Sequence, residues 1–352
     1  MRTRIQPTGE RPPLRVVESC TVCPTPQDSL GPQSGVRDPL DAAPLCCLVG
    51  PTAAGKTALA LAVCERAGAA VLSLDSMLVY RGLDIGTAKP SAAERARVAH
   101  HLIDLVDPME SYDIQRYLDD ARAALAGLGG QRALFVGGTG MYLMTLIHGL
   151  LAGPPTDPEL RGRLEEEVRE RGGAELHREL AAVDGAAAAR IHPNDTKRLV
   201  RALEVWRATG ETLSSWQGQW PAAGGEDERP GRASRIIHLD LPDAELDGRI
   251  ASRTEAMLAG GWVEEAVALR AGPGLGPTAI HALGYREVLD LADGLATEQE
   301  TREIIVRRTR RFSRRQRNWY RRFPARARLG AAAGGEPPEE LVDEALASLG
   351  WT

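Results

Sequence analysis

The chain has 352 residues, 43% hydrophobic and 26% charged, which suits one large globular domain or two moderate ones. A net charge of −5 excludes a surface that is basic throughout, but it allows a local basic face for a structured RNA. No apolar run reaches the ~20 residues that span a bilayer, and the first residues lack the apolar region of a signal peptide. We therefore expect a cytoplasmic protein without a membrane segment.

The first residues of the chain, 1–44, are rich in Pro, Gly and Ser and show no sustained period, which predicts a disordered leader. A C-x-x-C pair in this leader lacks the second pair of ligands that a zinc site needs. Cys46, Cys47 and Cys64 fall in apolar segments, so we expect them to be small core residues.

Strand patterns alternate with helical ones along much of the remaining chain. Short apolar segments predict strands at 45–50, 69–75, 132–136 and 235–242. Helices are expected after the first, third and fourth of them, with Asp243 as the cap of the last helix. This alternation predicts an α/β fold, with a parallel sheet flanked by helices like that of the P-loop NTPases.

One long region departs from this alternation. Residues 157–217 are helical in pattern and carry no strand signal, which predicts an all-helical insertion domain. Residues 218–234 are expected to form a loop that returns the chain to the sheet. The α/β core would then comprise 45–156 and 235–330 with its C-terminal helices, followed by a tail at 331–352.

A phosphate-binding pattern, G-x-x-x-x-G-K-[ST], stands between the first strand and its helix. Its residues are Gly50, Pro51, Thr52, Ala53, Ala54, Gly55, Lys56 and Thr57. Such a loop lets backbone N–H groups approach phosphate oxygens, while Lys56 adds a positive charge and the Thr57 hydroxyl can hold Mg²⁺. The pattern predicts binding of a di- or triphosphate without saying which one.

A carboxylate at the end of the second strand is the next candidate. ATPases commonly place an Asp at the end of a second apolar strand, but here 132–136 runs into Gly137, Gly138 and Thr139. Asp75 instead ends the strand at 69–75, where a side chain lies beside the phosphate loop in this architecture. It could bind metal through water, take a proton from an acceptor, or cap the next turn.

Two helical segments carry basic faces. In the first, Leu199, Leu203 and Trp206 should pack inward while Lys197 and Arg201 form a basic edge or a plain solvated face. Asn194 or Asp195 can cap its start. The second helical segment is 306–324. Its predicted inward stripe consists of Phe312, Gln316, Trp319 and Phe323. Its predicted outward row consists of Arg310, Arg314, Arg317 and Arg321. This pattern fits a membrane surface less well than RNA phosphates.

Five motifs resemble one family over residues 45–325. They are "GPTAAGKT", "DSMLVYRGLDIGTAKP", "VGGTGMYL", "AARIHPNDTKRLVRALEV" and "HALGYRE". The chain resembles the bacterial tRNA dimethylallyltransferases, also called tRNA isopentenyltransferases. The resemblance implies transfer of a dimethylallyl group from dimethylallyl diphosphate to N6 of adenine 37, which lies 3′ of the anticodon. The tRNAs are those that read codons beginning with U, and the products are N6-isopentenyladenosine and diphosphate.

The resemblance also implies roles for individual residues. The loop from Gly50 to Thr57 would bind the donor diphosphate, Thr57 would hold Mg²⁺ with waters, Asp75 would be the general base, and Arg253 would meet the leaving diphosphate. Contacts with the tRNA anticodon stem-loop would come from Asp75, Ser76, Met77, Leu78, Thr139, Arg161, Lys197, Arg198, Leu199, Val200, Arg201, His281, Gly284, Tyr285 and Arg286. We expect tRNA and dimethylallyl diphosphate as partners of a monomer.

Three other functions share part of this pattern. A nucleotide kinase would explain the phosphate loop and the arginines at 249 and 253, but neither the helical insertion nor the C-terminal arginines. A prenyltransferase acting on free AMP, ADP or ATP would need no RNA-gripping domain. A non-catalytic RNA-binding protein would have no use for the intact Lys56, Thr57 and Asp75.

Overall fold

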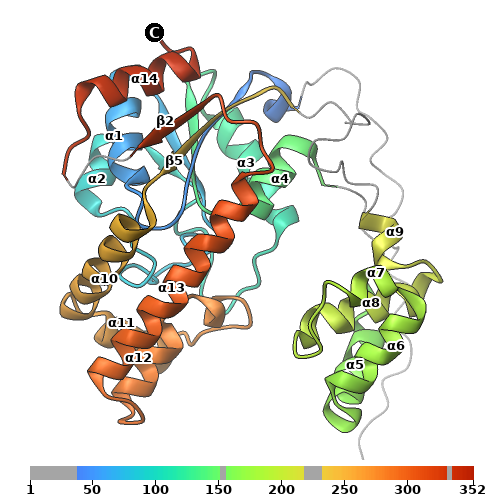
Figure 1. Ribbon diagram of the computed structural model, residues 1–352. Helices are drawn as coiled ribbons and strands as arrows, with labels where there is room; N and C mark the ends of the chain where they lie inside the picture. Colours follow the sequence, from blue (N-terminus) through green and yellow to red (C-terminus); the bar gives the residue numbers. More distant parts are fainter. Residues whose placement is uncertain (1–37, 151–155, 218–231, 331–334) are drawn as a thin grey trace, which may run out of the picture. The chain divides into compact units, whose positions relative to one another are not determined.

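The structure is a computed structural model that describes residues 38–150, 156–217, 232–330 and 335–352 (Figure 1). Most of the predicted leader, with its C-x-x-C pair, and most of the predicted loop at 218–234 lie outside these ranges. The strands are β1 Leu45–Val49, β2 Ala70–Leu74, β3 His100–His101, β4 Ala133–Gly137, β5 Ser234–Asp240 and β6 Ala327–Gly330. The helices of the core are α1 Lys56–Ala67, α2 Ala92–Arg97, α3 Ile114–Gly127, α4 Gly140–His148, α10 Asp243–Ala259, α11 Trp262–Ala271, α12 Tyr285–Ala292, α13 Glu298–Tyr320 and α14 Glu339–Leu349, with 3₁₀ turns at Pro39–Asp41 and Ala279–His281.

These strands form one parallel sheet in the order β3-β2-β4-β1-β5-β6. Cys47 in β1 is paired with Phe135 in β4 on one side and with Ile236 in β5 on the other. The predicted parallel α/β sheet flanked by helices is confirmed. Because all strands run the same way, the loops that follow β1, β2 and β4 emerge together at one edge, where this class of fold binds its ligands.

The two faces of the sheet each have a hydrophobic core, because alternate side chains of a strand point to opposite faces. Cys47 and Val49 of β1 face a cluster that includes Tyr117 of α3 and Leu143 of α4. Leu48 faces a second cluster formed with α1 and α14. Figure 1 shows α1 and α14 on one side of the sheet and α3 and α4 on the other. The predicted burial of the three cysteines in these segments is confirmed.

The ends of the core differ from the prediction. Leu40 in the first 3₁₀ turn is fully buried, and Asp38 before it pairs with Arg122 and Arg232, so the folded core already includes residues 38–44. The predicted C-terminal tail instead contains α14, whose apolar side chains recur every three or four residues and are buried: Val342, Ala345, Leu346 and Leu349. The helix forms because these residues cover the face of the sheet beside α1.

Two further features of the core were not predicted. β3 has two residues and β6 has four, both too short for a period-2 signal to be visible in the sequence. The first residue of α10 is Asp243, but its N-cap is Pro242, so the predicted cap is wrong. The Asp243 carboxylate pairs with Arg317 of α13 instead.

The insertion is helical as predicted. Its helices are α5 Pro158–Arg171, α6 Gly173–Val183, α7 Gly185–Ala188, α8 Thr196–Thr209 and α9 Leu213–Gln217. They bury a core of their own with Leu164, Leu176, Leu180 and Leu199 at its centre. Asp195 is the residue that caps α8, through a hydrogen bond from the backbone N–H of Arg198.

The longest helix of the described residues, α13, is strongly charged. Across the described ranges no helix is both long enough and apolar enough to cross a bilayer.

Candidate active site

The phosphate loop connects the end of β1 to the start of α1. Gly55 takes a φ of 87° as the N-cap of α1, a left-handed conformation that glycine adopts without strain. This turn aims the first N–H groups of α1 at the mouth of the loop, where a helix N-terminus attracts anions. The Lys56 ammonium folds back over the loop and donates to the carbonyl oxygens of Gly50 and Pro51 at 2.9 and 2.8 Å.

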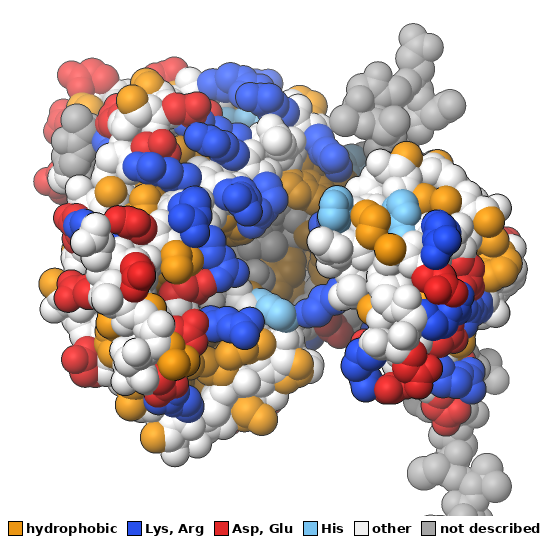
Figure 2. Space-filling model, turned by 60° about the horizontal axis from the view of Figure 1, so that its bottom comes forward, with side chains coloured by type: hydrophobic (Ala, Val, Ile, Leu, Met, Phe, Trp, Pro, Cys, Tyr) orange, Lys and Arg blue, Asp and Glu red, His pale blue; other side chains and the backbone are white. Residues whose placement is uncertain are grey.

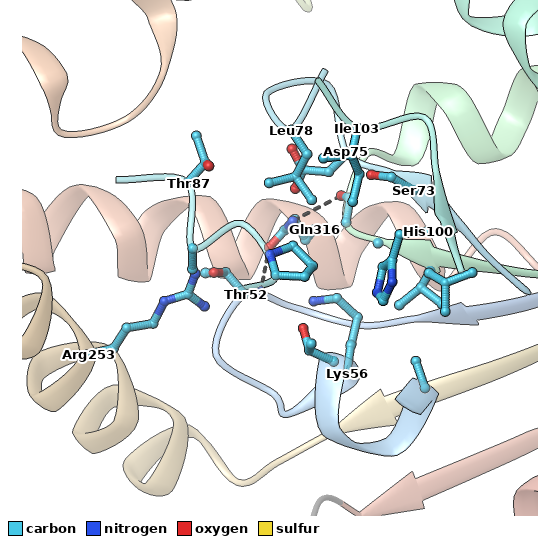
Figure 3. Close-up of a pocket in the computed structure, with 18 of the residues that line it drawn as sticks. Thr52, Lys56, Ser73, Asp75, Leu78, Thr87, His100, Ile103, Arg253 and Gln316 are labelled. Atoms are coloured by element: carbon cyan, nitrogen blue, oxygen red, sulfur yellow. Dashed lines mark hydrogen bonds between the residues drawn. The ribbon is translucent and has the colours of Figure 1, made fainter. Parts of the chain in front are cut away.

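Beside this loop is a cavity of about 150 Å³, shown in Figure 3. Its polar lining includes Thr52, Lys56, Thr57, Asp75 and Arg253. Its apolar lining includes Ala60, Val71, Leu78, Pro90, Ile103 and Val136. In Figure 3, Lys56 on α1 and Arg253 on α10 approach from different elements. A cavity with cations in one part and hydrocarbon in another suits a ligand that joins a diphosphate to a short apolar chain.

Burial of Lys56 and Arg253 in this cavity disfavours the charged form of both side chains. Burial, and then the nearby Arg253, lower the pKa of Lys56 from 10.5 to about 8, while Asp75 opposes them. Burial also lowers the pKa of Arg253, again against Asp75. A bound polyanion would relieve the repulsion between the two cations, because each would gain an opposite charge at close range. The electrostatics therefore favour an anionic ligand beside Lys56.

Donor binding should depend on the protonation of Lys56. Above its pKa of about 8, the free protein carries this amine neutral, so binding of a diphosphate must take up a proton. We expect the Kd of a diphosphate ligand to be nearly constant from pH 6.5 to 7.5 and to rise as pH increases above 8, by up to about tenfold per unit. Calorimetric titration in buffers of different ionisation enthalpy measures the proton uptake. A Kd that is flat between pH 7 and 9.5 would contradict this role of Lys56.

A second, larger cavity of about 440 Å³ adjoins the first. Its lining includes Ser76, Met77, Thr139 and His281, together with Arg308, Arg311 and Arg315 of α13. Both cavities are lined by Thr52, Asp75, Thr87, Arg253 and Phe312. Asp75 therefore stands where a chamber beside the phosphate loop meets a chamber lined by arginines.

The backbone around Asp75 is held by the neighbouring loop. Oδ1 of Asp75 accepts from the N–H of Met77 at 2.9 Å, so the carboxylate also caps the turn, one of the roles considered from the sequence. The Thr139 hydroxyl oxygen accepts from the N–H of Ser76 at 3.1 Å. The N–H groups of Gly138 and Thr139 donate to the Leu74 carbonyl at 3.1 and 3.0 Å. The ends of β2 and β4 thus form one rigid unit.

The predicted tRNA contacts of the core fall into different environments. Ser76, Met77, Thr139 and His281 line the second cavity, whereas Leu78 lines the first. Arg286 is exposed on α12.

Two of the predicted tRNA contacts, Gly284 and Tyr285, are enclosed by the fold. Tyr285 is fully buried and its hydroxyl donates to Glu265 at 2.6 Å, while Gly284 packs tightly against Trp262. Neither residue offers a side chain to RNA, so only their backbone remains for a tRNA contact.

In the insertion the predicted basic edge is smaller than expected. Lys197 and Arg198 are exposed on α8. Arg161 and Arg201, however, both pair with the buried carboxylate of Glu204, at 2.8 and 3.0 Å. The side chains of Leu199 and Val200 are buried, as a consequence of the apolar period of α8, and only their backbone remains for a tRNA contact. The i, i+3 spacing of Arg201 and Glu204 signals their pair in the sequence, whereas the pair between Arg161 of α5 and Glu204 cannot be read from it.

The prediction of an outward row of arginines on α13 is also partly wrong. Arg317 is bound to Asp240, Asp243 and the Leu241 carbonyl, and Arg310 pairs with Asp247. The predicted inward stripe holds, since Gln316 and Phe323 are buried and Phe312 and Trp319 are half-buried. Figure 2 shows a band of Lys and Arg side chains across the presented face of the core.

The arginines that line the second cavity were missed from the sequence. They are Arg308, Arg311 and Arg315, and the last lies over the Phe312 ring at 5.7 Å. Their spacing of i, i+3 and i+7 is a helical stripe that borders Phe312, so the signal was present. It was hidden because arginines occur on almost every face of this helix.

Comparisons with known proteins agree with this geometry. The model of the IPP transferase family matches residues 78–323, and that of the isopentenyl transferases matches 44–104. A tRNA dimethylallyltransferase from Alkalilimnicola ehrlichii is 45% identical over 79% of this chain and 88% of its own length. One from Halorhodospira halophila is 45% identical over 82% of this chain and 95% of its own length.

Solved structures agree in fold. The tRNA isopentenylpyrophosphate transferase from Bacillus halodurans has a TM-score of 0.61 and 33% identity, covering 88% of this chain and 96% of that one. A eukaryotic dimethylallyltransferase acting on tRNA, 23% identical, has a TM-score of 0.63 over 79% of this chain and 70% of its own, which shows the fold alone. With the family model matching most of the chain and relatives at 45% identity over most of their length, this chain belongs to the IPP transferase family.

Proposed function

We propose that this protein transfers the dimethylallyl group of dimethylallyl diphosphate to N6 of adenine 37 in tRNAs that read codons beginning with U. The observation that carries the proposal is the pair of adjoining cavities with Asp75 at their junction. One has phosphate-binding groups and an apolar wall, as the donor requires. The other is lined by arginines and has a volume of about 440 Å³, which is large enough for a nucleobase. The relatives named tRNA dimethylallyltransferase support the same reaction class.

The chemistry assigns a task to each part of the site. The adenine amine is a weak nucleophile, so its N6 lone pair attacks C1 of the donor as the C1–O bond breaks toward diphosphate. Lys56, Arg253 and the N–H groups of the phosphate loop stabilise the charge that grows on the leaving diphosphate. Asp75 takes the proton that N6 loses when the N6–C1 bond forms. The apolar wall of the first cavity would keep out water, which would otherwise capture the allylic centre.

The proposed Mg²⁺ fits the groups present. Mg²⁺ prefers oxygen ligands and keeps several waters, and the Thr57 hydroxyl and Asp75 carboxylate both line the first cavity. Among the described residues there is no cluster of three or more His, Cys, Asp or Glu that could hold a metal by itself. The diphosphate would therefore have to complete the site. Bound in this way, Mg²⁺ would supply further charge neutralisation on the leaving group.

Loss of the Thr57 hydroxyl should be visible as a change in metal dependence. We expect Thr57→Ala to raise the Mg²⁺ concentration for half-maximal activity by about tenfold or more, because it removes a ligand of the ion. Thr57→Ser keeps the hydroxyl and should stay near the wild type. Chelation of divalent metal by EDTA should abolish turnover in all three proteins. An unchanged Mg²⁺ dependence of Thr57→Ala would contradict the assignment of Thr57.

The partner tRNA would have to present adenine 37 outside its base stack, since the reacting N6 must reach the junction at Asp75. Arg311 and Arg315 are placed to meet the phosphates or bases around it, whereas Arg308 in the same cavity pairs with Glu287. Lys197 and Arg198 of the insertion are exposed for a second contact. We expect the protein to act as a monomer in the cytoplasm, where its tRNA substrates are found.

Nucleoside analysis tests the position of the modification. Unmodified tRNA reading a U-initial codon is incubated with the protein, Mg²⁺ and dimethylallyl diphosphate, then digested and separated by liquid chromatography with mass detection. We expect N6-isopentenyladenosine, and none of it when adenine 37 of the same tRNA is replaced by guanine. Equal modification of the two tRNAs would overturn the assignment of adenine 37, and modification of neither would overturn the proposed reaction.

A further inference from the structure

One buried amide connects the two loops that form the active site. Gln316 of α13 is 5% exposed and lines the first cavity. Its Oε1 accepts from the backbone N–H of Thr52 at 2.8 Å, and its Nε2 donates to the Gly138 carbonyl at 2.9 Å. Figure 3 shows both bonds as dashed lines on either side of the Gln316 side chain. Its carbonyl and its NH₂ group are thus both used, each by a different loop.

The two loops serve different substrates in the proposed reaction. Thr52 belongs to the phosphate loop, which would hold the donor. Gly138 belongs to the turn after β4, and its own N–H donates to Leu74, the residue before Asp75. Thr139 in the same turn accepts from Ser76 and lines the second cavity. Gln316 therefore ties the donor loop to the unit that carries the base.

The packing around Gln316 leaves it little freedom. A Cβ on Gly138 would lie 2.1 Å from Nε2 of Gln316, so the glycine lets the amide come this close to the turn. Ser313 and Tyr320 are buried on either side of Gln316 along α13. On the same helix Phe312 lines both cavities and Arg315 lines the second. The amide is thus fixed by the helix that also lines the acceptor side.

We propose that Gln316 is a positioning residue for the transfer, which sets the distance between the donor diphosphate and Asp75. This inference rests on the proposed function. An apolar side chain of similar length would leave the Thr52 N–H and the Gly138 carbonyl without a buried partner, so the two loops could shift relative to each other. Each loop would still bind its own substrate. The variant should therefore lose stabilisation of the transition state and have a lower kcat. A misplacement of about 1 Å can reduce the rate about a hundredfold.

Gln316→Met tests this role, with Gln299→Met as the matched control. Gln299 is at the exposed start of the same helix and its amide bonds only the neighbouring turn, through Glu303. We expect kcat of Gln316→Met to fall about 30- to 100-fold. The Kd values for tRNA and for an unreactive thio-analogue of dimethylallyl diphosphate should stay within about threefold of the wild type, which is the pattern of lost transition-state stabilisation. Gln299→Met should behave as the wild type.

The pH dependence of kcat in Gln316→Glu gives a second measurement, and it should not change if the role of Gln316 is only structural. A protonated Glu can still accept from Thr52 and donate to Gly138, but an ionised one has no proton to donate. The kcat of this variant relative to the wild type should therefore rise as pH falls from 8 to 5.5. The wild type measured at each pH is the reference, because Asp75, Lys56 and Arg253 line the same cavity in both proteins.

The outcomes separate this inference from the proposed function. If the wild type itself fails to label tRNA, the proposed function is contradicted. If the wild type labels tRNA and folded Gln316→Met has a kcat within twofold of it, the role of Gln316 is contradicted. A loss in Gln316→Met that disappears at saturating donor would also overturn it, since Gln316 would then act in donor binding alone. Thermal unfolding of each variant establishes that it is folded at the assay temperature.

Discussion

Asp75→Asn is expected to reduce kcat by about 10²- to 10⁴-fold while leaving donor binding nearly unchanged. The amide oxygen can still accept the N–H of Met77, so the turn after β2 keeps its shape. What the variant lacks is a group that can take the proton from the adenine amine. Single-turnover transfer to tRNA measures the chemical step, and titration with the thio-analogue measures donor affinity.

The control for this experiment is Asp119→Asn, which changes an exposed carboxylate on α3 in the same way. It should retain the activity of the wild type. Turnover of Asp75→Asn close to that of the wild type would remove Asp75 as the base, and would leave it only the turn-capping role.

Arg253→Met is expected to lower kcat/KM for dimethylallyl diphosphate by about 10²- to 10³-fold. Arg253 lines both cavities and is close enough to Lys56 for its charge to help lower the pKa of that ammonium. Methionine preserves much of the length of the side chain but removes the charge that would meet the leaving diphosphate. Steady-state kinetics at varied donor concentration and saturating tRNA give the value.

Arg249→Met is the matched control, one turn earlier on the same helix. Arg249 pairs with Glu245 and lines neither of the two cavities, so we expect less than a threefold change. Equal losses in the two variants would point instead to a lid of paired arginines, which is the arrangement that a nucleotide kinase would use.

The sheet and the phosphate loop could be predicted because their signals are local. The strand β1 is a continuous apolar run, and the loop after it has a fixed spacing of Gly55, Lys56 and Thr57 whose physical reason is known. Asp75 could be predicted for a related reason, since the end of a parallel strand beside the phosphate loop has few possible positions in space.

The wrong predictions for charged residues share one physical cause, which is that the pattern of a helix does not show which carboxylates its arginines meet. Arg317 looks like part of an exposed basic stripe, but it pairs with Asp240 at the end of β5 and with Asp243 at the start of α10. Arg161 looks available for RNA, but it pairs with Glu204 on a different helix, α8, where Arg201 pairs with the same carboxylate. A helical period tells which residues share a face, but it does not tell what that face meets.

The prediction of a C-terminal tail in place of α14 was wrong for a different reason. The apolar positions of α14 follow a run of Gly, Pro and Glu that resembles a tail, and the helix is only eleven residues long. Short helices draw most of their stability from packing, here against α1 and the sheet, so the sequence alone gives a weak signal.

The most direct test of the central claim is label incorporation from radiolabelled dimethylallyl diphosphate, with Mg²⁺, with unmodified tRNA reading a U-initial codon, and with or without ATP. We predict label in tRNA at the same rate in both cases, because the phosphate loop at Gly50 would hold an isoprenoid diphosphate and not a nucleotide. Label in added AMP but not in tRNA would move the protein to the free-nucleotide prenyltransferases. No label in either, with ATP consumed, would contradict the account, because the loop would then serve a kinase.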